Sequence, residues 1–526
     1  MKFITHPALV ALGVATLCLL ILLSPLVSPE HRSVYHLYGS AFSIFVPVLM
    51  TLATVWLILA ALLWFAERQM WFHTILWASL IVLTPWMLLR DWFSLKSAPL
   101  PHWFHALDLC SPLLIFALVL CARQPSLASW FQRLQGFAQV LLGFSSLSGI
   151  LLLCQFALFT WQARALNARL PLHSRHAASA AAAGHRVIWI LFDELSYEQV
   201  YGRRFPGLQL PAFDQLATDS TVFTHAVAPA VLTELAVPSL MTGLPVDRIR
   251  ITADGRRLFL HDTTHGTWTV FDPHQTVFED ALDAGYSTAV AGWYNPYCRI
   301  LPEVLDRCFW TNHVGAPGGM FPGQAIPWNT TAFFRHHLQP ILAHLGERIP
   351  TAQEYDSQFH QLDYRDLIDA ADSLLTDSSA SFVFLHMPVP HPGGIYDRQR
   401  SSFTTSRSSY IDNLALADHY LGHVHDLLEQ RGEWNSSTVV VMGDHSWRTK
   451  LMWRAAPFWT AEDEAASQGG QFDDRPAYIV KLPNQQSRTE VDAPFQAIRT
   501  RALFDELLRH RLVTPDDLAG WTSRKP

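Results

Sequence analysis

The stretch VIWILFDE, Val187–Glu194, decides how the larger part of this chain folds. Its leading residues form an uninterrupted apolar run, which is typical of a short strand that is buried on both faces of a sheet. The stretches STAVAGW (287–293), SFVFLHM (381–387) and TVVVMG (438–443) have the same character, and helical patterns lie between them. Strands that alternate with helices predict an α/β domain around a mainly parallel sheet, which we place at residues 185–526.

The residues before this domain are far more apolar than those within it. Half of the 526 residues are hydrophobic, a share that soluble domains rarely reach. Stretches of about 18 or more apolar residues can cross a hydrocarbon core of about 30 Å. Several in succession, joined by short polar segments, favour a membrane domain over residues 1–161 rather than buried helices of a soluble protein. The predicted spans are Pro7–Val27, Gly39–Phe65, Trp71–Leu89, Phe104–Ala122 and Gly136–Trp161.

The charges that flank the spans predict how this membrane domain is oriented. LVSPEH (26–31) lacks a small-residue cleavage site, so the first span is expected to stay as an anchor. With the N-terminus inside, the outer loops hold Arg32, Arg90 and Lys96. The inner loops then hold Lys2, Arg68, Arg123 and Arg133. This slight excess of inner basic residues follows the positive-inside rule and places everything after Trp161 on the outer side. Asp108, the one acid within a span, is expected to face other helices.

Cysteine placement agrees with an exported domain. After the spans and an Ala-rich linker or interfacial segment at residues 162–184, only Cys298 and Cys308 remain. Two cysteines that close a short loop in an oxidising compartment favour a disulfide, the alternative being two buried thiols. The net charge of -7 argues against a nucleic-acid partner.

Two of the predicted strands end in residues that can bind a metal. VIWILF runs into Asp193-Glu194, and TVVVMG runs into Asp444-His445. Ligands of open α/β sheets bind beyond the carboxyl ends of the strands, so the two pairs can converge on one site. Carboxylates together with an imidazole suit a divalent cation such as zinc or manganese. Taken singly, either pair is better explained as a helix cap or a loop acid.

The segment VLTELAVPSLMTG, Val231–Gly243, contains a candidate nucleophile. Pro238 is expected in the first turn of a helix and Gly243 at its end, with Thr233 preceding that turn. Anions bind near helix N-termini, because free backbone N–H groups point there. If a metal also binds the Thr233 oxygen, the threonine could attack as an alkoxide. Taken alone, Thr233 is better explained as a helix cap.

The order of these features resembles the alkaline phosphatase/sulfatase superfamily. A strand with Asp-Glu, a Thr before a Pro-containing helix, a histidine cluster and a strand with Gly-Asp-His follow one another between His185 and Leu512. The preceding spans narrow the likeness to the membrane-anchored branch, which includes the lipid A phosphoethanolamine transferases and the lipoteichoic acid synthases. The resemblance implies an alkaline-phosphatase-like α/β domain on the periplasmic or extracellular side of a bacterial cytoplasmic membrane. It also implies one divalent metal ion, zinc or manganese ahead of calcium or magnesium.

The family pattern assigns roles to residues of this chain. It implies that Asp193, Thr233, Asp444 and His445 bind the metal and that Thr233 is the nucleophile. Glu194, beside Asp193, could replace it as a ligand. The threonine of the phosphoethanolamine transferases stands five residues before a proline, as Thr233 does before Pro238.

Two departures from the wider family limit the chemistry. Sulfatases carry an oxidisable Cys or Ser two residues before the proline and an Arg two residues after it, where this chain has Ala236 and Leu240. The two-zinc phosphatases need a further C-terminal histidine. After His445 the chain has only His510, within a predicted terminal helix, so a complete second metal site is not expected.

Three further residues are candidates for the site. HMPVPHPGGIY (386–396) supplies His386 and His391, and His391 matches the family histidine that contacts substrate or protonates a leaving group. A general acid of this kind contributes about 10²–10⁴-fold. His386 is a candidate for metal or substrate binding, and Arg448 could hold an anionic substrate oxygen.

These features together predict a membrane-anchored, metal-dependent phosphotransferase or phosphodiesterase. Thr233 would attack phosphorus in a lipid head group of the phosphoethanolamine or glycerol phosphate type. Water, or an acceptor hydroxyl on a lipid or a surface glycan, would then resolve the phospho-threonine. The alternatives are a hydrolase of sulfate esters, against which Ala236 argues, and a non-catalytic member that binds a lipid or a partner.

Overall fold

The computed structural model describes residues 4–23, 32–95, 102–166, 172, 185–313, 320, 324–344, 352–450, 453–456 and 458–524. The chain forms two compact units. The first comprises residues 1–33, 39–165 and 317–341, and the second comprises residues 34–38, 166–316 and 342–526. Two short segments, 34–38 and 317–341, therefore belong to other units than the predicted domain limits place them in. Apart from Leu172, the predicted linker lies outside the described residues from residue 167 onward.

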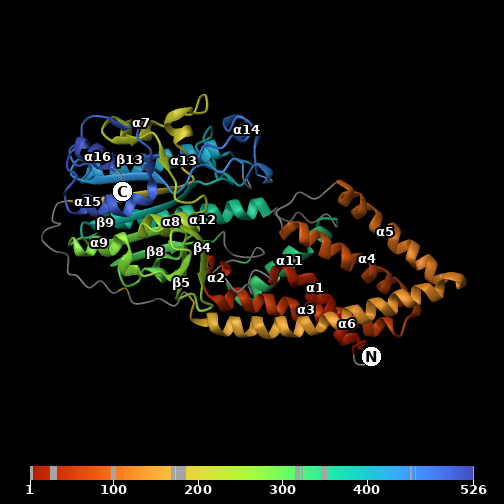
Figure 1. The fold of residues 1–526 in the computed structure, drawn as a ribbon. Helices are drawn as coiled ribbons and strands as arrows, with labels where there is room; N and C mark the ends of the chain where they lie inside the picture. Colours follow the sequence, from red (N-terminus) through yellow and green to blue (C-terminus); the bar gives the residue numbers. More distant parts are fainter. Residues whose placement is uncertain are drawn as a thin grey trace. The chain divides into compact units, whose positions relative to one another are not determined.

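The first unit is a set of apolar helices, drawn from red to orange in Figure 1. The helices that match the predicted spans are α1 (Pro7–Leu23), α3 (Ala41–Ala66), α4 (Met70–Leu95), α5 (His102–Arg123) and α6 (Pro125–Gln162). Most of α11 (Ile326–His344) also belongs to this unit.

Length and composition qualify three stretches of the described helices as membrane spans. These are Ala41–Ala66, Met70–Leu89 and Pro125–Gln162, while Pro7–Cys18 and Cys110–Arg123 are shorter apolar segments. These properties fit a membrane-anchored protein, and the predicted number of five spans stays a prediction. The side chain of Asp108 lies outside the described residues.

Close packing of α1 against α6 depends on small residues. A methyl group on Gly13 would clash with the carbonyl oxygen of Leu142, and one on Gly149 would clash with the side chain of Thr16. Helices that carry small residues at their contact can bring their backbones together, which is how apolar helices gain packing energy in a bilayer.

The second unit is built on an eight-stranded sheet, with strand order β14-β2-β13-β12-β1-β9-β7-β8. Every neighbouring pair is parallel except the two pairs that involve β13. The predicted mainly parallel sheet is therefore confirmed (Figure 1). Its strands are β1 (Val187–Asp193), β2 (Thr221–Phe223), β7 (Thr288–Trp293), β8 (Arg307–Thr311), β9 (Phe382–Pro390), β12 (Thr438–Gly443), β13 (Tyr478–Lys481) and β14 (Thr489–Val491).

Helices cover both faces of this sheet, which explains why β1 is buried along its whole length. Successive strand side chains point to opposite faces. Ile188 and Phe192 pack in one cluster with α7 (Pro211–Thr218), α12 (Ala352–Thr376) and α13 (Tyr410–Gln430). Trp189, on the other face, contacts Phe504 of α15 (Thr500–Leu508), which packs against α8 (Thr233–Thr242) and α9 (Val277–Asp283).

Smaller elements complete the chain. They are α2 (Arg32–His36), α10 (Tyr297–Ile300), α14 (Ala461–Ala466), α16 (Pro515–Thr522), β3 (Ala226–Val227), β4 (Val246–Ile251), β5 (Leu258–Asp262), β6 (Thr267–Val270), β10 (Tyr396–Asp397), β11 (Ser402–Phe403) and β15 (Phe495–Gln496). Cys298 and Cys308 form the predicted disulfide, which joins α10 to β8.

Two predicted helix positions are wrong. Helix α8 begins at Thr233 itself, so Pro238 lies inside the helix and not in its first turn. The proline removes only the bond that its missing N–H would make to the carbonyl of Glu234, one turn from the helix start. Gly243 ends α8, as predicted, and the structure shows it in the left-handed conformation with φ 77°. His510 lies beyond the end of α15 and not within a helix.

Candidate active site

The predicted site residues meet at the carboxyl ends of two neighbouring strands. Strands β1 and β12 are parallel and in register from Val187–Thr438 to Phe192–Gly443, so the residues that follow them lie side by side. The N-terminus of α8 reaches the same place. The Thr233 hydroxyl lies 3.3 Å from Asp193 Oδ2 and 3.3 Å from His445 Nε2.

Three of these side chains have the composition of a metal site. Asp193, Asp444 and His445 each offer a ligand atom, and these atoms lie within 4.8 Å of one another. Asp193 Oδ1 and Asp444 Oδ2 are buried without a hydrogen-bond partner among the described residues. Buried carboxylate oxygens without partners are costly unless they are protonated or bound to a cation. The arrangement therefore fits a divalent ion held by two carboxylates and an imidazole.

The protonation states follow from burial. Burial, together with the charges of Asp444 and Glu194, raises the pKa of Asp193 well above its usual value. Burial also raises the pKa of Asp444. Burial and the nearby Arg448 charge lower the pKa of His445 to about 4, so its imidazole is neutral at pH 7. A neutral imidazole is the form that binds metals, and a bound cation would draw both carboxyls back to their ionised forms.

Backbone geometry holds the two strand ends together. Glu194 has a left-handed conformation, with φ 64°, which is strained for a residue with a side chain. In this conformation its backbone N–H donates to Asp444 Oδ1 at 3.0 Å. The His445 N–H donates to the same oxygen at 2.9 Å, which leaves Asp444 Oδ2 directed elsewhere.

The carboxylate of Glu194 binds protein donors. The Arg448 Nε donates to Glu194 Oε1 at 2.7 Å, and the Arg448 backbone N–H donates to Oε2 at 3.1 Å. Trp453 Nε1 also donates to Oε1, at 2.7 Å. The geometry therefore favours Asp193 over Glu194 as the ligand beside His445. It also places Arg448, the candidate for binding a substrate oxygen, in a buried ion pair.

Both candidate histidines lie beside the acids at the end of β1. His391 Nε2 is 3.9 Å from Glu194 Oε1, and Asp193, Glu194 and His391 form a second group with metal-ligand spacing. His386 Nε2 is 3.9 Å from Asp193 Oδ2 and is buried without a hydrogen-bond partner among the described residues. Burial, followed by the Arg448 charge, lowers the pKa of His391 well below its usual value.

His510 is far from this site. Its ring contacts that of His185, with centroids 4.8 Å apart, and His185 stands before the start of β1. Strand β1 has seven residues, so its two ends are on the order of 20 Å apart. His510 therefore cannot complete a second metal site at the carboxyl ends of the strands.

Two residues of the site carry no sequence signal. Trp453 donates to Glu194 from a loop that carries no known motif. Tyr297, whose hydroxyl lies 2.7 Å from His386 Nδ1, stands beside Cys298 and belongs to no motif of its own.

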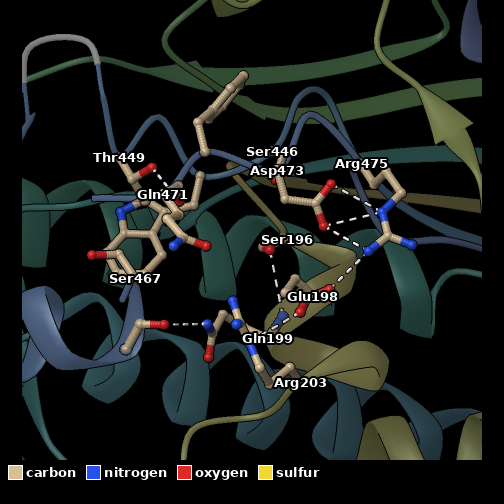
Figure 2. Close-up of a pocket in the computed structure, with 13 residues that line it drawn as sticks. Ser196, Glu198, Gln199, Arg203, Ser446, Thr449, Ser467, Gln471, Asp473 and Arg475 are labelled. Atoms are coloured by element: carbon tan, nitrogen blue, oxygen red, sulfur yellow. Dashed lines mark hydrogen bonds and ion pairs between the residues drawn. The ribbon is translucent and has the colours of Figure 1, made fainter. Parts of the chain in front are cut away.

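A polar cavity of about 170 Å³ adjoins the segment after His445 and is lined in part by Ser446 and Trp447. Figure 2 shows Arg475 of this cavity directed at Asp473 and Glu198. Each carboxylate lies 2.8 Å from this guanidinium, and Glu198 also pairs with Arg203 at 3.2 Å, so two arginines offset the charges of the two acids. Charge pairing thus distinguishes this cavity from the group around Asp193, where carboxylate oxygens lack partners.

Comparison with known proteins identifies the family. A family model described as Sulfatase matches residues 185–477, which is more than half of the chain. A search of curated proteins found no match. A phosphonate monoester hydrolase from Silicibacter pomeroyi is 15% identical, over 62% of this chain and 73% of that chain, with TM-score 0.39. A Bacteroides thetaiotaomicron protein of glycosaminoglycan metabolism is 13% identical, over 64% of this chain and 79% of that chain, with TM-score 0.42. The identities and TM-scores of these structures are too low to decide the activity of this chain. The family model covers residues 185–477, and the metal-ligand group of Asp193, Asp444 and His445 lies within that range. This chain belongs to the sulfatase family.

Proposed function

We propose that the protein is a membrane-anchored, metal-dependent phosphotransferase or phosphodiesterase that acts on a lipid phospho-head-group of the phosphoethanolamine or glycerol phosphate type. The observation that carries the proposal is the position of the Thr233 hydroxyl, 3.3 Å from Asp193 and 3.3 Å from His445 in a buried site. A hydroxyl at a helix N-terminus, next to metal-binding groups, is placed to attack a phosphoryl centre.

The roles of the residues follow from their positions. Asp193, Asp444 and His445, with the Thr233 oxygen, would hold one divalent ion, zinc or manganese ahead of calcium or magnesium. Such an ion would lower the pKa of the hydroxyl and offset charge on the phosphoryl oxygens. Thr233 Oγ1 would attack phosphorus, the lipid alcohol would leave, and the head group would remain on Thr233 as a phosphodiester.

His391 fits the second half of the reaction. Its lowered pKa keeps the imidazole neutral at pH 7, so one ring nitrogen has a lone pair for a proton and the ring is not the imidazolium that a general acid requires. A neutral His391 would deprotonate water, or the acceptor hydroxyl on a lipid or a surface glycan, as that oxygen attacks the phospho-threonine. This assignment differs from the general acid that the family pattern implies.

Sulfate-ester hydrolysis is the alternative that the family name raises. A formylglycine enzyme needs an oxidisable side chain where this chain has Ala236, and Ala236 is buried inside α8. A sulfated Thr233 would have no aldehyde hydrate to expel sulfate and would stall after one event. Phospho-threonine can be resolved by a second in-line attack, which is why phosphorus is the preferred centre.

The apolar helices of the first unit support a lipid as the substrate. The apolar helices of the first unit would keep the catalytic domain at a bilayer, where lipid head groups are concentrated. The Cys298–Cys308 disulfide fits a domain on the periplasmic or extracellular side, because such bonds persist in oxidising compartments.

The decisive experiment is the intact mass of the purified full-length protein after incubation with phospholipid vesicles. We expect a head-group adduct on Thr233 that is absent from Thr233→Ala and present in the control Thr242→Ala, which removes another buried hydroxyl of α8. Steady turnover of a nitrophenyl phosphodiester, with almost none of nitrophenyl sulfate, is expected alongside. Sustained sulfate release that survives Thr233→Ala would overturn both the nucleophile and the substrate class.

A further inference from the structure

A short segment between α1 and α3 is built into the catalytic unit. Residues 34–38 belong to the second unit, and the Tyr35 side chain is fully buried there. Its hydroxyl donates to Asn295 Oδ1 at 2.9 Å. The Arg299 guanidinium donates to the carbonyls of Val34 and Tyr35, at 2.9 and 2.6 Å, and so holds the segment in place.

Tyr35 is the first member of a buried hydrogen-bond chain that ends at the candidate metal site. Asn295 Nδ2 donates to the Tyr297 hydroxyl at 3.2 Å, and that hydroxyl lies 2.7 Å from His386 Nδ1. Tyr35, Asn295, Tyr297 and His386 are each fully buried. The other ring nitrogen, His386 Nε2, faces Asp193 Oδ2 across 3.9 Å.

The direction of donation along this chain determines where His386 carries its proton. Tyr35 has one proton and gives it to the amide oxygen of Asn295. The amide nitrogen of Asn295 donates to the Tyr297 hydroxyl, and among the contacts of that hydroxyl with described residues only His386 Nδ1, at 2.7 Å, is then left to accept its proton. A neutral imidazole that accepts at Nδ1 is protonated at Nε2. The ring nitrogen next to Asp193 is thus a hydrogen-bond donor and has no lone pair to offer a metal.

We propose that His386 is a catalytic hydrogen-bond donor to a non-bridging oxygen of the transferred group, and that Tyr35, Asn295 and Tyr297 are positioning residues that hold its tautomer. A fixed donor stabilises the charge that develops on this oxygen in the transition state. No proton is transferred, because Nε2–H only donates a hydrogen bond. The inference rests on the proposed function for the identity of that oxygen, but not for the tautomer.

The disulfide supports the same arrangement. Cys298 lies between Tyr297 and Arg299, so the bond to Cys308 anchors the turn that carries both the relay tyrosine and the arginine that holds the Tyr35 segment. A loop so tied loses little freedom when the relay forms, which favours a single donation pattern.

Metal content tests the tautomer without any turnover. The full-length His386→Ala and His386→Gln proteins, purified and analysed by elemental mass spectrometry, should hold as much metal as the wild type. Asp444→Asn, measured beside them, should hold less. If His386→Ala loses metal to the same extent as Asp444→Asn, then Nε2 is a ligand, the chain donates in the opposite direction, and the proposal is overturned.

Kinetics on a nitrophenyl phosphodiester test the relay. His386→Ala should lower kcat about 10²–10³-fold, the usual effect of losing an oxyanion donor. Tyr297→Phe and Tyr35→Phe should lower kcat about 10- to 100-fold with KM unchanged, as loss of the partner behind a functional histidine does. In the His386→Ala background neither tyrosine change should have a further effect, because both act through that ring.

The matched control is Tyr420→Phe. Tyr420 is also buried, and its hydroxyl lacks a hydrogen-bond partner among the described residues, so its removal should leave kcat unchanged. Equal losses in Tyr420→Phe and Tyr35→Phe, or additive losses in the double variants, would show that the tyrosines act only through packing and would overturn the relay. Failure of the proposed function is distinguishable, because it would appear as turnover that survives Thr233→Ala while the metal results stand.

Discussion

Replacing Thr233 distinguishes a nucleophile from a structural hydroxyl. Loss of a nucleophile should abolish turnover and leave stability almost unchanged, whereas loss of a structural hydroxyl should lower stability and leave turnover largely intact. The Thr233→Ala protein should fold and melt almost like the wild type and keep the Asp193, Asp444 and His445 ligands of the metal, and yet turn over almost no phosphodiester. Thr233→Ser keeps the hydroxyl and should keep measurable activity.

The magnitudes come from the contacts of the hydroxyl. Its two neighbours lie at 3.3 Å, beyond the usual length of a strong hydrogen bond, so their loss should change the free energy of unfolding by about 1 kcal/mol or less. Loss of a nucleophile lowers kcat by about 10⁶-fold, or about 8 kcal/mol of activation free energy. Serine lacks the methyl group that restricts rotation, so Thr233→Ser should lose at most about 10²-fold.

The assay uses full-length protein in detergent, with thermal melting, metal content and phosphodiester turnover measured on each variant. Thr242→Ala is the control, because its hydroxyl lies on the same helix and bonds only to backbone, donating to the Pro238 carbonyl at 2.7 Å and accepting from the Leu244 N–H at 3.2 Å. If Thr233→Ala keeps more than about a tenth of the wild-type rate, then Thr233 is not the nucleophile, because loss of a nucleophile lowers kcat by many orders of magnitude. If Thr242→Ala loses as much activity as Thr233→Ala, then the loss comes from disturbing α8 and not from removing a nucleophile.

Three further predictions follow from the same site. Asp444→Asn and His445→Ala should each lower metal content measured after purification, and stoichiometric metal in both would place the site elsewhere. In chelated protein the pKa of Asp193 is raised above its unfolded value near 3.8, so ionisation opposes folding. Melting temperature of the chelated protein should therefore rise as pH falls through that raised pKa toward 3.8, where only the folded state holds the Asp193 proton, and this gain should vanish when metal is restored. Thiol labelling without reductant should miss Cys298 and Cys308 in protein exported to an oxidising compartment, and labelling of either would contradict both the disulfide and the outer location.

Local sequence patterns predicted the sheet and the meeting of the metal-binding residues. Val187–Phe192 is apolar at every position because helices cover both faces of the strand. A continuous apolar run therefore predicts this burial from the sequence alone. Parallel strands bring their carboxyl ends together, so the residues after β1 and β12 meet even though Glu194 and Asp444 are 250 positions apart in the sequence. These inferences need no knowledge of distant packing.

Contacts between distant residues could not be predicted in this way. Tyr35 and Asn295 are 260 residues apart, and neither stands in a motif or a periodic pattern. The same holds for Trp453, which binds Glu194 from a loop. The start of α8 was misplaced because a proline tolerated one turn inside a helix has the same local signature as one in the first turn.

The adjacent acids Asp193 and Glu194 show where sequence and structure differ most. The sequence alone does not decide which of the two acids is the metal ligand, because either carboxylate could end a strand and bind a cation. The left-handed conformation of Glu194 breaks this symmetry, since it directs the backbone N–H to Asp444 and the side chain to Arg448. A buried arginine without its carboxylate would be an unpaired charge, which is strongly destabilising. Glu194 therefore serves the site by tying the segment after β12 to the end of β1, and Asp193 is left with an unpartnered oxygen for the metal.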